Sequence, residues 1–282
     1  VSQLTLADLV TEVGDLIHLG VRAVILFGVP AVKDPIGSGA FDPDGIVQVA
    51  LRELRATYGD RIVLMADLCV DEYTDHGHCG VLTANGEVDD ATLAIYAKAA
   101  VAQADAGAHV VAPSGMMDGQ VGAIRAALDA AGHTGVSILA YSAKYASGLY
   151  GPFRDAVDVQ IAGGGHRKGY QQDWRNAREA MIELDADIAQ GADMVMIKPA
   201  LAYLDVIAAA RERTNVPVAA YQVSGEYAMV KAVAANGWID HDAVALEQLT
   251  AIKRAGADMI LTYFTRWFAE HRPTVQHQGV QA

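Results

Sequence analysis

The stretch DMVMIKPA at residues 193–200 decides how the chain is interpreted. A short apolar run that ends in a charged residue and a proline is typical of a buried strand in a parallel sheet. Lys198 would then lie at the C-terminal tip of a strand, where parallel barrels carry their catalytic groups. Loss of water favours the neutral amine of a lysine, which can form a Schiff base with a ketone. The alternative for this segment alone is a strand-end lysine whose ammonium reaches solvent.

A second segment of the same design precedes the first along the chain. VSILAYSAK at 136–144 is an apolar run that ends in Lys144. Consecutive parallel strands usually lie next to each other, about 4.8 Å apart. Two ammonium groups at that spacing repel, so at least one of the two pKa values should fall. The pair therefore favours one site with two amines over two solvent-exposed lysines.

The composition narrows the classes of protein that need to be considered. The chain has 282 residues, 52% of them hydrophobic, with 21 basic and 34 acidic side chains. The net charge of −13 argues against a nucleic-acid partner or an anionic membrane surface. Two cysteines do not make a disulfide framework, and neither a signal-peptide pattern nor an apolar run of spanning length is found. We therefore expect a cytoplasmic protein with a large core.

Helical and apolar segments alternate along the chain. A helix is expected over 4–19, followed by strands that start near 22, 61, 108, 136, 193, 216 and 258, with helices between them. This alternation predicts parallel βαβ units in a single domain over residues 1–282. Polar residues at the ends of five or more strands favour a (β/α)8 barrel over an open sheet, whose ligand site lies at one switch point.

Seven strands are one fewer than a closed parallel barrel requires. We therefore expect the first strand, preceded by an arm that packs on a neighbouring subunit, to lie upstream of Val1. The strand near 22 would then be the second of eight, and a gap would separate it from the strand near 258. Seven strands closed directly on one another would contradict this expectation.

One loop contains both cysteines of the chain. DLCVDEYTDHGHCG at 67–80 also holds two histidines and four carboxylates. Two thiolates with a carboxylate or an imidazole suit zinc. The spacing of Cys69 and Cys79 is not that of a zinc finger, so the alternative is a polar loop with two incidental cysteines.

A second long insertion, at residues 147–174, is rich in glycine and contains the run GGGHRK at 163–168. Long loops of this kind at a barrel mouth are often lids. Arg154 and Arg167 in the insertion can each hold a carboxylate through two parallel hydrogen bonds. The alternative is a solvated loop with surface arginines.

Hydroxyl groups follow the last two expected strands. Tyr221 and Ser224 come after the strand near 216, and Tyr263 ends the strand near 258. Hydroxyls in these positions can bind a carboxylate or position a water molecule. Taken singly, each is more often structural than functional.

Several motifs together resemble those of the porphobilinogen synthase (5-aminolevulinate dehydratase) family. The similarity runs from about Leu9 to Thr265 and implies a (β/α)8 barrel. It also implies an enzyme that condenses two 5-aminolevulinate molecules to porphobilinogen by lysine Schiff-base chemistry, an early step of tetrapyrrole biosynthesis. The motifs are YSAKYAS at 141–147, YGPFRDA at 150–156, MIKPA at 196–200, YQVSGEYAM at 221–229, TDHGHCG at 74–80, VAPSGMMDG at 111–119 and KRAGAD at 253–258.

The resemblance implies roles for individual side chains. Lys198 would form the Schiff base with the first substrate, in the P site, and Lys144 would serve the second, in the A site. Asp67 would assist proton transfer. Arg154, Arg167 and Gln171 would hold the A-site substrate, Ser224 and Tyr263 would take the P-site carboxylate, and Tyr221 and Phe153 would complete the substrate-binding set.

The metal loop departs from the family's pattern. Zinc-type members carry three cysteines and magnesium-type members carry acidic or other residues, whereas this loop has Cys69, Asp71 and Cys79. Zn²⁺ held by these three side chains and water is the interpretation we favour. Glu183 falls where some members bind an allosteric Mg²⁺, and its alternative is an exposed helix glutamate. The family's N-terminal arm implies a homo-octamer for the full-length protein.

Two other functions are considered beside this one. A different Schiff-base barrel, of the class I aldolase type, needs one lysine and usually a phosphate site, so two strand-end lysines and a cysteine loop count against it. The second alternative is a catalytically silent structural subunit. The presence of both lysines, both arginines and Ser224 in one chain counts against it. Formation of porphobilinogen from 5-aminolevulinate, with and without chelator, distinguishes the three.

Overall fold

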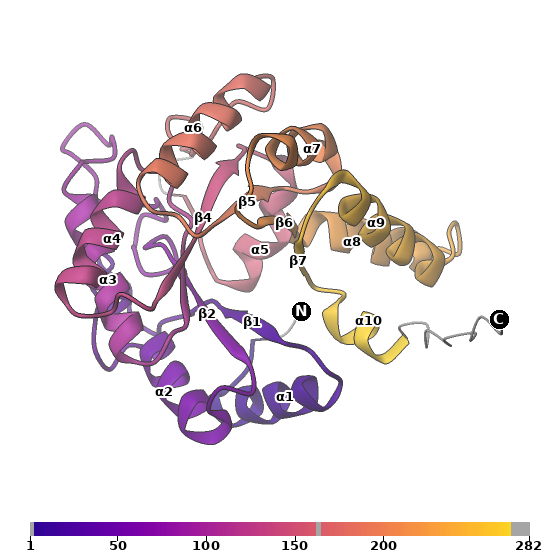
Figure 1. The fold of residues 1–282 in the computed structure, drawn as a ribbon, viewed down its shortest axis with the longest axis horizontal. Coiled ribbons are helices and arrows are strands. Elements are labelled where there is room, and N and C mark those ends of the chain that lie inside the picture. The colour runs from indigo at the N-terminus through magenta and orange to yellow at the C-terminus, as the bar shows by residue number, and fades with distance from the viewer. Residues whose placement is uncertain (1–2, 162–164, 272–282) are drawn as a thin grey trace, which may run out of the picture.

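A computed structural model of the chain describes residues 3–161 and 165–271. Seven parallel strands form one sheet whose spatial order is the order of the chain (Figure 1). The sheet is curled, and most helices lie on its outer side, whereas α5 (Gly151–Ala156) lies within the curl (Figure 1). The prediction of parallel βαβ units is confirmed. The strands are β1 (Ala23–Leu26), β2 (Val63–Leu68), β3 (Val110–Pro113), β4 (Ser137–Lys144), β5 (Met194–Lys198), β6 (Val218–Gln222) and β7 (Met259–Thr262).

The helices follow the strands in the expected positions, with local signals at several ends. The side chain of Asn176 accepts hydrogen bonds from the first turn of α6, and that of Asp240 does the same for α9. The described helices are α1 (Leu6–His18), α2 (Ile46–Tyr58), α3 (Thr92–Asp105), α4 (Gln120–Ala130), α5 (Gly151–Ala156), α6 (Ala177–Ala189), α7 (Leu204–Arg213), α8 (Ser224–Ala235), α9 (His241–Ala255) and α10 (Thr265–His271).

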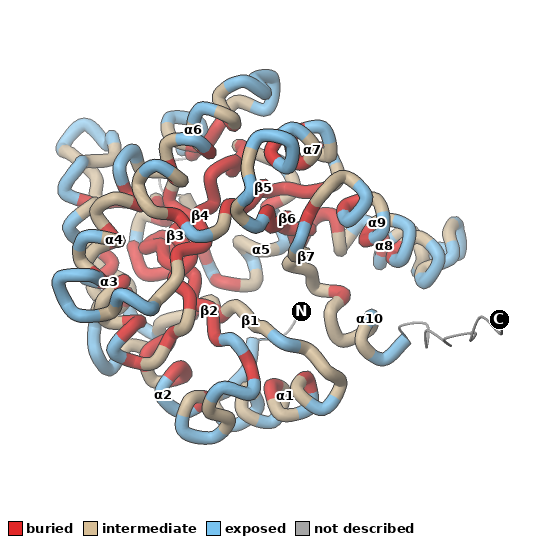
Figure 2. The backbone as a smooth tube through the Cα atoms, viewed as in Figure 1, coloured by how far each residue is buried: buried red, intermediate tan, exposed pale blue. Residues whose placement is uncertain are grey.

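The central strands are buried on both faces, as Figure 2 shows by their colour. On β4, Ile138 packs outward against Ile124 and Leu128 of α4, whereas Leu139 packs inward with Met196 of β5. Full burial of a side chain of this size contributes about 1.5–3 kcal/mol. The two-sided burial explains why these strands read as continuous apolar runs instead of alternating ones.

The sheet has two edges, β1 and β7, and no backbone pairing joins them in the described residues. A gap therefore separates the two strands, as expected. It holds a cavity of about 330 Å³ lined mainly by apolar side chains such as Ile25 and Leu261. Outside the gap, Arg266 of α10 donates to Glu12 of α1 at 3.0 Å and ties the two ends of the sheet together. The eighth strand itself stays a prediction.

Three local expectations differ from the structure. The insertion at 147–174 does not begin as a loop, because Ser147 caps a short turn that leads into α5. The sequence predicts a helix from Tyr227, but α8 begins earlier, at Ser224, since Glu226 accepts the Val223 N–H at 2.6 Å. Helix α10 was not foreseen. Part of the glycine run at 163–165 lies outside the described residues.

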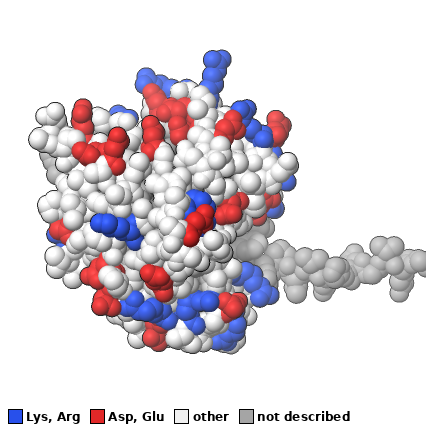
Figure 3. Space-filling view, turned by 60° about the vertical axis from the view of Figure 1, so that its left-hand side comes forward, with Lys and Arg blue, Asp and Glu red and all other residues white. Residues whose placement is uncertain are grey.

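The surface agrees with the charge composition. Acidic and basic side chains are interspersed over the face in Figure 3, without a single basic patch there. No helix in the described ranges is both long and apolar enough to cross a membrane.

Candidate active site

An irregularity in β4 brings the two lysines level with each other. Leu139 and Ala140 pair with Met194 and Val195 of β5, but the register then shifts by one residue before the last two pairs. After the shift, Lys144 is directly opposite Lys198. Without the extra residue Ala143 would take that place, and Lys144 would point to the other face of the sheet. The two lysines are therefore neighbours at the tips of adjacent strands, as predicted.

Lys198 lies in an aromatic cage. Its Nζ atom is 4.5 Å from the ring centre of Tyr221 and between 5.2 and 5.4 Å from those of Tyr141, Tyr150 and Phe153. Burial first, and the charge of Lys144 second, lower the pKa of Lys198 to about 7. Near neutral pH a large share of this amine is uncharged, as a nucleophile requires.

Lys144 has the opposite tendency. Burial alone would lower its pKa, but Cys79, Cys69 and Asp71 raise it above the ordinary value. Its ammonium donates to the backbone carbonyl of Ser114, at the end of β3. The two lysines thus differ: Lys198 is partly uncharged near neutral pH, whereas Lys144 keeps its positive charge.

Asp67, at the end of β2, is an acid–base group whose pKa is influenced by both lysines. It accepts the hydroxyl of Ser114 at 3.1 Å through one oxygen, and the other oxygen has no partner among the described residues. Burial raises the pKa of Asp67 to about 6, although Lys144 and Lys198 oppose the change. A carboxyl with that pKa can both accept and return a proton near neutral pH.

Lys144→Met should move the reaction of Lys198 with carbonyl compounds to higher pH. Lys198 reacts as the neutral amine, so its rate rises as the pH passes upward through its pKa of about 7. The Lys144 charge lowers that pKa, so removing the charge raises it. Reductive alkylation by a small keto acid, followed at Lys198 by peptide mapping between about pH 5 and pH 9, measures the shift.

The exposed Lys231 on α8 supplies the control for this experiment. Lys231→Met should leave the pH dependence of Lys198 alkylation unchanged, because the Lys231 side chain is exposed and solvent screens its charge. If the alkylation rate of Lys198 rose over the same pH range in Lys144→Met as in the wild type, the proposed coupling of the two amines would be contradicted.

The pocket around the lysines contains most of the residues that the sequence singled out. It also contains residues that received no role from the sequence: Phe27, Glu72, Ser114, Tyr150 and Val223. Ser114 directly follows β3, so its place at a strand end could have identified it. The predicted members of the lining are Asp67, Asp71, Lys144, Phe153, Arg154, Arg167, Lys198, Tyr221, Ser224 and Tyr263.

Two predicted residues lie elsewhere. Gln171 and Glu183 line a separate cavity of about 880 Å³, together with acidic side chains such as Asp118. Glu183 is not part of the cysteine group, and burial followed by the charge of Asp118 raises its pKa. Gln171 is buried, and its side-chain nitrogen has no partner within the described chain.

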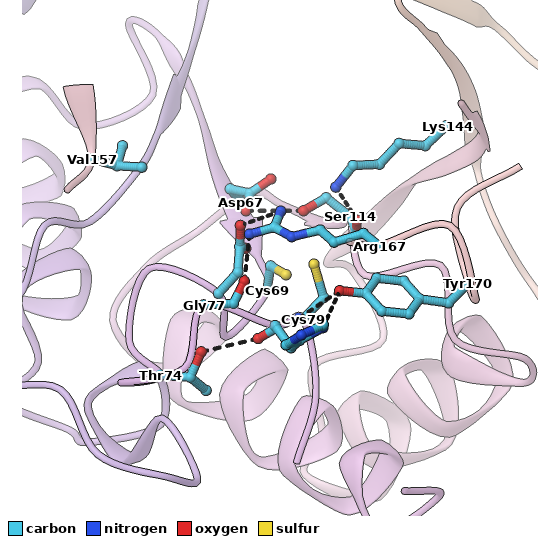
Figure 4. A network of polar contacts seen from close by, with 12 residues as sticks. Asp67, Cys69, Thr74, Gly77, Cys79, Ser114, Lys144, Val157, Arg167 and Tyr170 are labelled. Carbon is cyan, nitrogen blue, oxygen red and sulfur yellow. Dashed lines mark hydrogen bonds and ion pairs between the residues drawn. The ribbon is translucent and has the colours of Figure 1, made fainter. Parts of the chain in front are cut away.

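Cys69, Asp71 and Cys79 form a compact group at the pocket, and Figure 4 shows the two cysteines of this group close to Arg167. One ligand atom from each residue lies within 4.8 Å of the others, and all three side chains are buried. Burial raises the pKa of Cys69, whereas the hydrogen bond from Cys69 and the charge of Arg167 outweigh burial and lower the pKa of Cys79 to about 7. Two sulfurs and a carboxylate at this spacing can bind a metal ion.

Asp71 is also the partner of Arg167, a contact that the sequence did not indicate. The Nη1 atom of Arg167 is 2.7 Å from Asp71, and its Nη2 atom donates to the carbonyl of Gly77 at 2.7 Å. Both charged side chains are buried, and Arg167 lowers the pKa of Asp71 despite the opposing effect of burial. One residue expected to hold a metal and one expected to hold a substrate are therefore bound to each other.

Several buried polar atoms at this pocket have no hydrogen-bond partner among the described residues. They belong to Asp67, Arg154, Arg167 and Ser224. Buried polar groups in folded proteins are nearly always paired, so unpaired ones at one pocket indicate a polar ligand. Two arginines and a hydroxyl at the mouth, with an amine below, suit a small molecule that has a carboxylate and a carbonyl group.

Comparisons with known proteins agree with this chemistry. A sequence profile described as "Delta-aminolevulinic acid dehydratase" matches residues 1–271. A protein of that name from Mycobacterium tuberculosis is 61% identical over 248 residues, which are 87% of this chain and 75% of the relative. Its counterpart from Streptomyces coelicolor is 60% identical over 251 residues, 88% of this chain and 76% of the relative.

The fold has a close counterpart among solved structures. The delta-aminolevulinic acid dehydratase (porphobilinogen synthase) of Toxoplasma gondii, crystallised with the reaction product porphobilinogen, superposes with a TM-score of 0.93 at 45% identity. The match covers 95% of this chain and 77% of that one. The similarity therefore extends over the whole described sheet and its helices.

Proposed function

The chain belongs to the delta-aminolevulinic acid dehydratase family, and we propose that Lys198 forms the Schiff base through which it condenses two 5-aminolevulinate molecules to porphobilinogen. The observation that carries this assignment is the in-register lysine pair, in which Lys198 has a pKa of about 7. A neutral amine inside an aromatic cage can attack the substrate ketone. The resulting iminium is a cation and remains in contact with the ring faces.

The other groups of the pocket supply charge and proton transfer. When the Lys198 nitrogen attacks the carbonyl carbon, the carbonyl oxygen takes up protons and leaves as water. Asp67, with a pKa of about 6, is placed to give and take those protons. We assign Lys144 to the second substrate, where its positive charge stabilises negative charge that develops on an oxygen atom.

Each substrate carries a carboxylate, and the pocket offers two sets of partners. Ser224 is at the N-terminus of α8, where backbone dipoles favour an anion, and Tyr263 lies close by in the same lining. We assign these hydroxyls to the first substrate. Arg154 and Arg167 would hold the carboxylate of the second, and Arg167 must then leave Asp71 or share it.

We propose zinc as the ion at Cys69, Asp71 and Cys79. Two thiolates and a carboxylate give the three protein ligands of an open zinc site, and thiolates select zinc over magnesium. A bound zinc ion would supply a Lewis acid next to the second substrate. The residues of this chain then hold and orient that substrate through Arg154 and Arg167.

The assay that tests both the function and the metal follows porphobilinogen formation from 5-aminolevulinate. We expect activity that falls after treatment with a chelator and returns with Zn²⁺.

Asp71→Cys should tighten zinc binding by more than about 10-fold, because a soft ligand replaces a hard one. Full activity with Mg²⁺ alone, in protein shown by elemental analysis to lack zinc, would refute the zinc assignment. Absence of porphobilinogen from zinc-loaded protein would refute the function.

Three further proposals complete the assignment. An eighth parallel strand fills the gap between β1 and β7, since it would pair both free edges and cover the apolar cavity there. Glu183 and Asp118 bind an allosteric Mg²⁺ in the acidic cavity that they share. The protein assembles as an octamer in the cytoplasm, and light scattering of the purified protein measures the size of the assembly.

A further inference from the structure

The backbone of Cys79 is held by two tyrosines from different parts of the fold. The hydroxyl of Tyr96, on α3, donates to the Cys79 carbonyl at 2.6 Å. The hydroxyl of Tyr170, in the second insertion, accepts the Cys79 N–H at 3.3 Å. The Tyr96 hydroxyl also lies 3.5 Å from the sulfur of Cys69. Tyr96 therefore contacts both cysteines of the group.

The position of the Tyr96 hydroxyl depends on Gly115. A Cβ atom added to Gly115 would lie 1.8 Å from this hydroxyl and 2.5 Å from the ring carbon that carries it. No side chain other than hydrogen leaves room there, because real contacts do not approach so closely. Gly115 follows β3 and Tyr96 is fully buried, so the ring has no solvent route by which to avoid the clash.

We propose that Tyr96 is a positioning residue for the Cys69–Asp71–Cys79 group, which it keeps at metal-binding spacing before the ion arrives. The inference rests on the proposed metal role of these residues. By fixing the Cys79 carbonyl, the hydroxyl fixes the backbone from which the Cys79 sulfur projects. Its contact with Cys69 places the second sulfur, so that both thiolates lie within ligand range of Asp71.

The chemistry of the hydroxyl suits this task. Tyr96 is fully buried, and its hydroxyl can act as a hydrogen-bond donor. A hydroxyl can rotate about its C–O bond and donate either to the Cys79 carbonyl or to a Cys69 thiolate. Partners of this kind orient metal ligands, and their loss typically lowers metal affinity by about 10–100-fold.

A tyrosine of purely structural role provides the matched control. Tyr58, on α2, also donates to a backbone carbonyl at 2.6 Å, that of Val10. It too faces a glycine, since a Cβ on Gly14 would lie 2.5 Å from its hydroxyl. Within residues 3–161 and 165–271, this hydroxyl forms no hydrogen bond with a cysteine. Tyr58→Phe therefore removes an equivalent hydrogen bond far from the cysteine group.

The experiment measures Co²⁺ and Zn²⁺ affinity of the metal-free protein by competition with a chromophoric chelator, and follows the thiolate-to-cobalt absorption band. Tyr96→Phe should bind both ions about 10–100-fold more weakly, while Tyr58→Phe binds like the wild type. Gly115→Ala, which displaces the Tyr96 ring, should weaken binding in the same direction. Thermal unfolding in parallel checks that each variant is folded under the conditions of the binding assay.

Two outcomes would overturn the inference, and they separate it from the proposed function. Wild-type affinity in a folded Tyr96→Phe variant would show that the hydroxyl is structural only. Equal Co²⁺ binding by the wild type and Cys79→Ser, without a thiolate band in either, would remove the metal site and the positioning role with it. Neither result would affect trapping of substrate at Lys198, which tests the Schiff-base assignment independently.

Discussion

Lys198→Ala should abolish porphobilinogen formation while the protein remains folded. The amine is the atom that bonds to the substrate, and no other neutral amine is expected at its place, because Lys144 is charged. Lys198→Arg should not restore activity, since a guanidinium stays protonated at all accessible pH values. Turnover of 5-aminolevulinate and borohydride trapping of the substrate, with mapping of the modified peptide, measure the two effects.

The exposed Lys231 again provides the reference variant. Lys231→Ala should retain full turnover and full labelling of Lys198. If borohydride labelled another residue and spared Lys198 in the wild type, the covalent role of Lys198 would be wrong, whatever the activity of the alanine variant.

Asp71→Ala should destabilise the metal-free protein by about 3–5 kcal/mol. The substitution leaves the Arg167 guanidinium buried without its carboxylate partner, and an uncompensated buried charge is costly. For a domain of this size the loss corresponds to a fall of roughly 10 °C in the midpoint of thermal unfolding. Calorimetry in the presence of chelator measures it without interference from bound metal.

An exposed pair of the same composition serves as the comparison. Arg213 and Asp185 form a two-pronged ion pair between α7 and α6, both largely in solvent. Asp185→Ala should leave the midpoint essentially unchanged, because exposed ion pairs contribute little. In Asp71→Leu/Arg167→Met most of the lost stability should return, since no charge remains buried. A small effect of Asp71→Ala would mean that Arg167 finds water or another acceptor.

The positions of the strands could be predicted from the sequence because each is a short apolar run, and Gly107, Gly191 and Gly256 mark helix ends just before three of them. The neighbouring lysines could also be predicted, from the rule that consecutive parallel strands pair. The register shift between Ala140 and Ala143 could not. With simple alternation along β4, the Lys144 side chain would point to the outer face of the sheet. No residue type in SILAYSAK indicates that the strand contains one extra residue.

Interactions between distant loops were beyond the reach of sequence patterns. Asp71 and Arg167 come from separate insertions, and each was assigned to a different ligand. Local spacing carries no information on which of two such loops folds over the other. The role proposed for Tyr96 could not be predicted either, since a tyrosine on a helix is usually a core residue. The position of its hydroxyl depends on the space left by Gly115, which is distant in sequence.

The alternatives considered from the sequence are resolved by the family assignment. Identity of 60% or more to dehydratases over most of the chain excludes a class I aldolase of another family as the better interpretation. One pocket contains Lys198 with a lowered pKa, the charged Lys144 and Asp67 with a raised pKa. This combination also argues against a catalytically silent subunit.

The strands lie in the sheet in the same order as they occur along the chain, and this arrangement links ligand binding to folding. Asp67 comes from β2, Lys198 from β5, and Tyr263 from the end of β7, so the pocket is complete only when nearly the whole sheet has assembled. A partly folded chain then has no full-affinity site, and a ligand stabilises the native state alone. At a concentration of 100 times Kd that linkage amounts to about 2.7 kcal/mol. Bound substrate or product would thus raise the free energy of unfolding of a sheet whose two edges do not pair in the described chain.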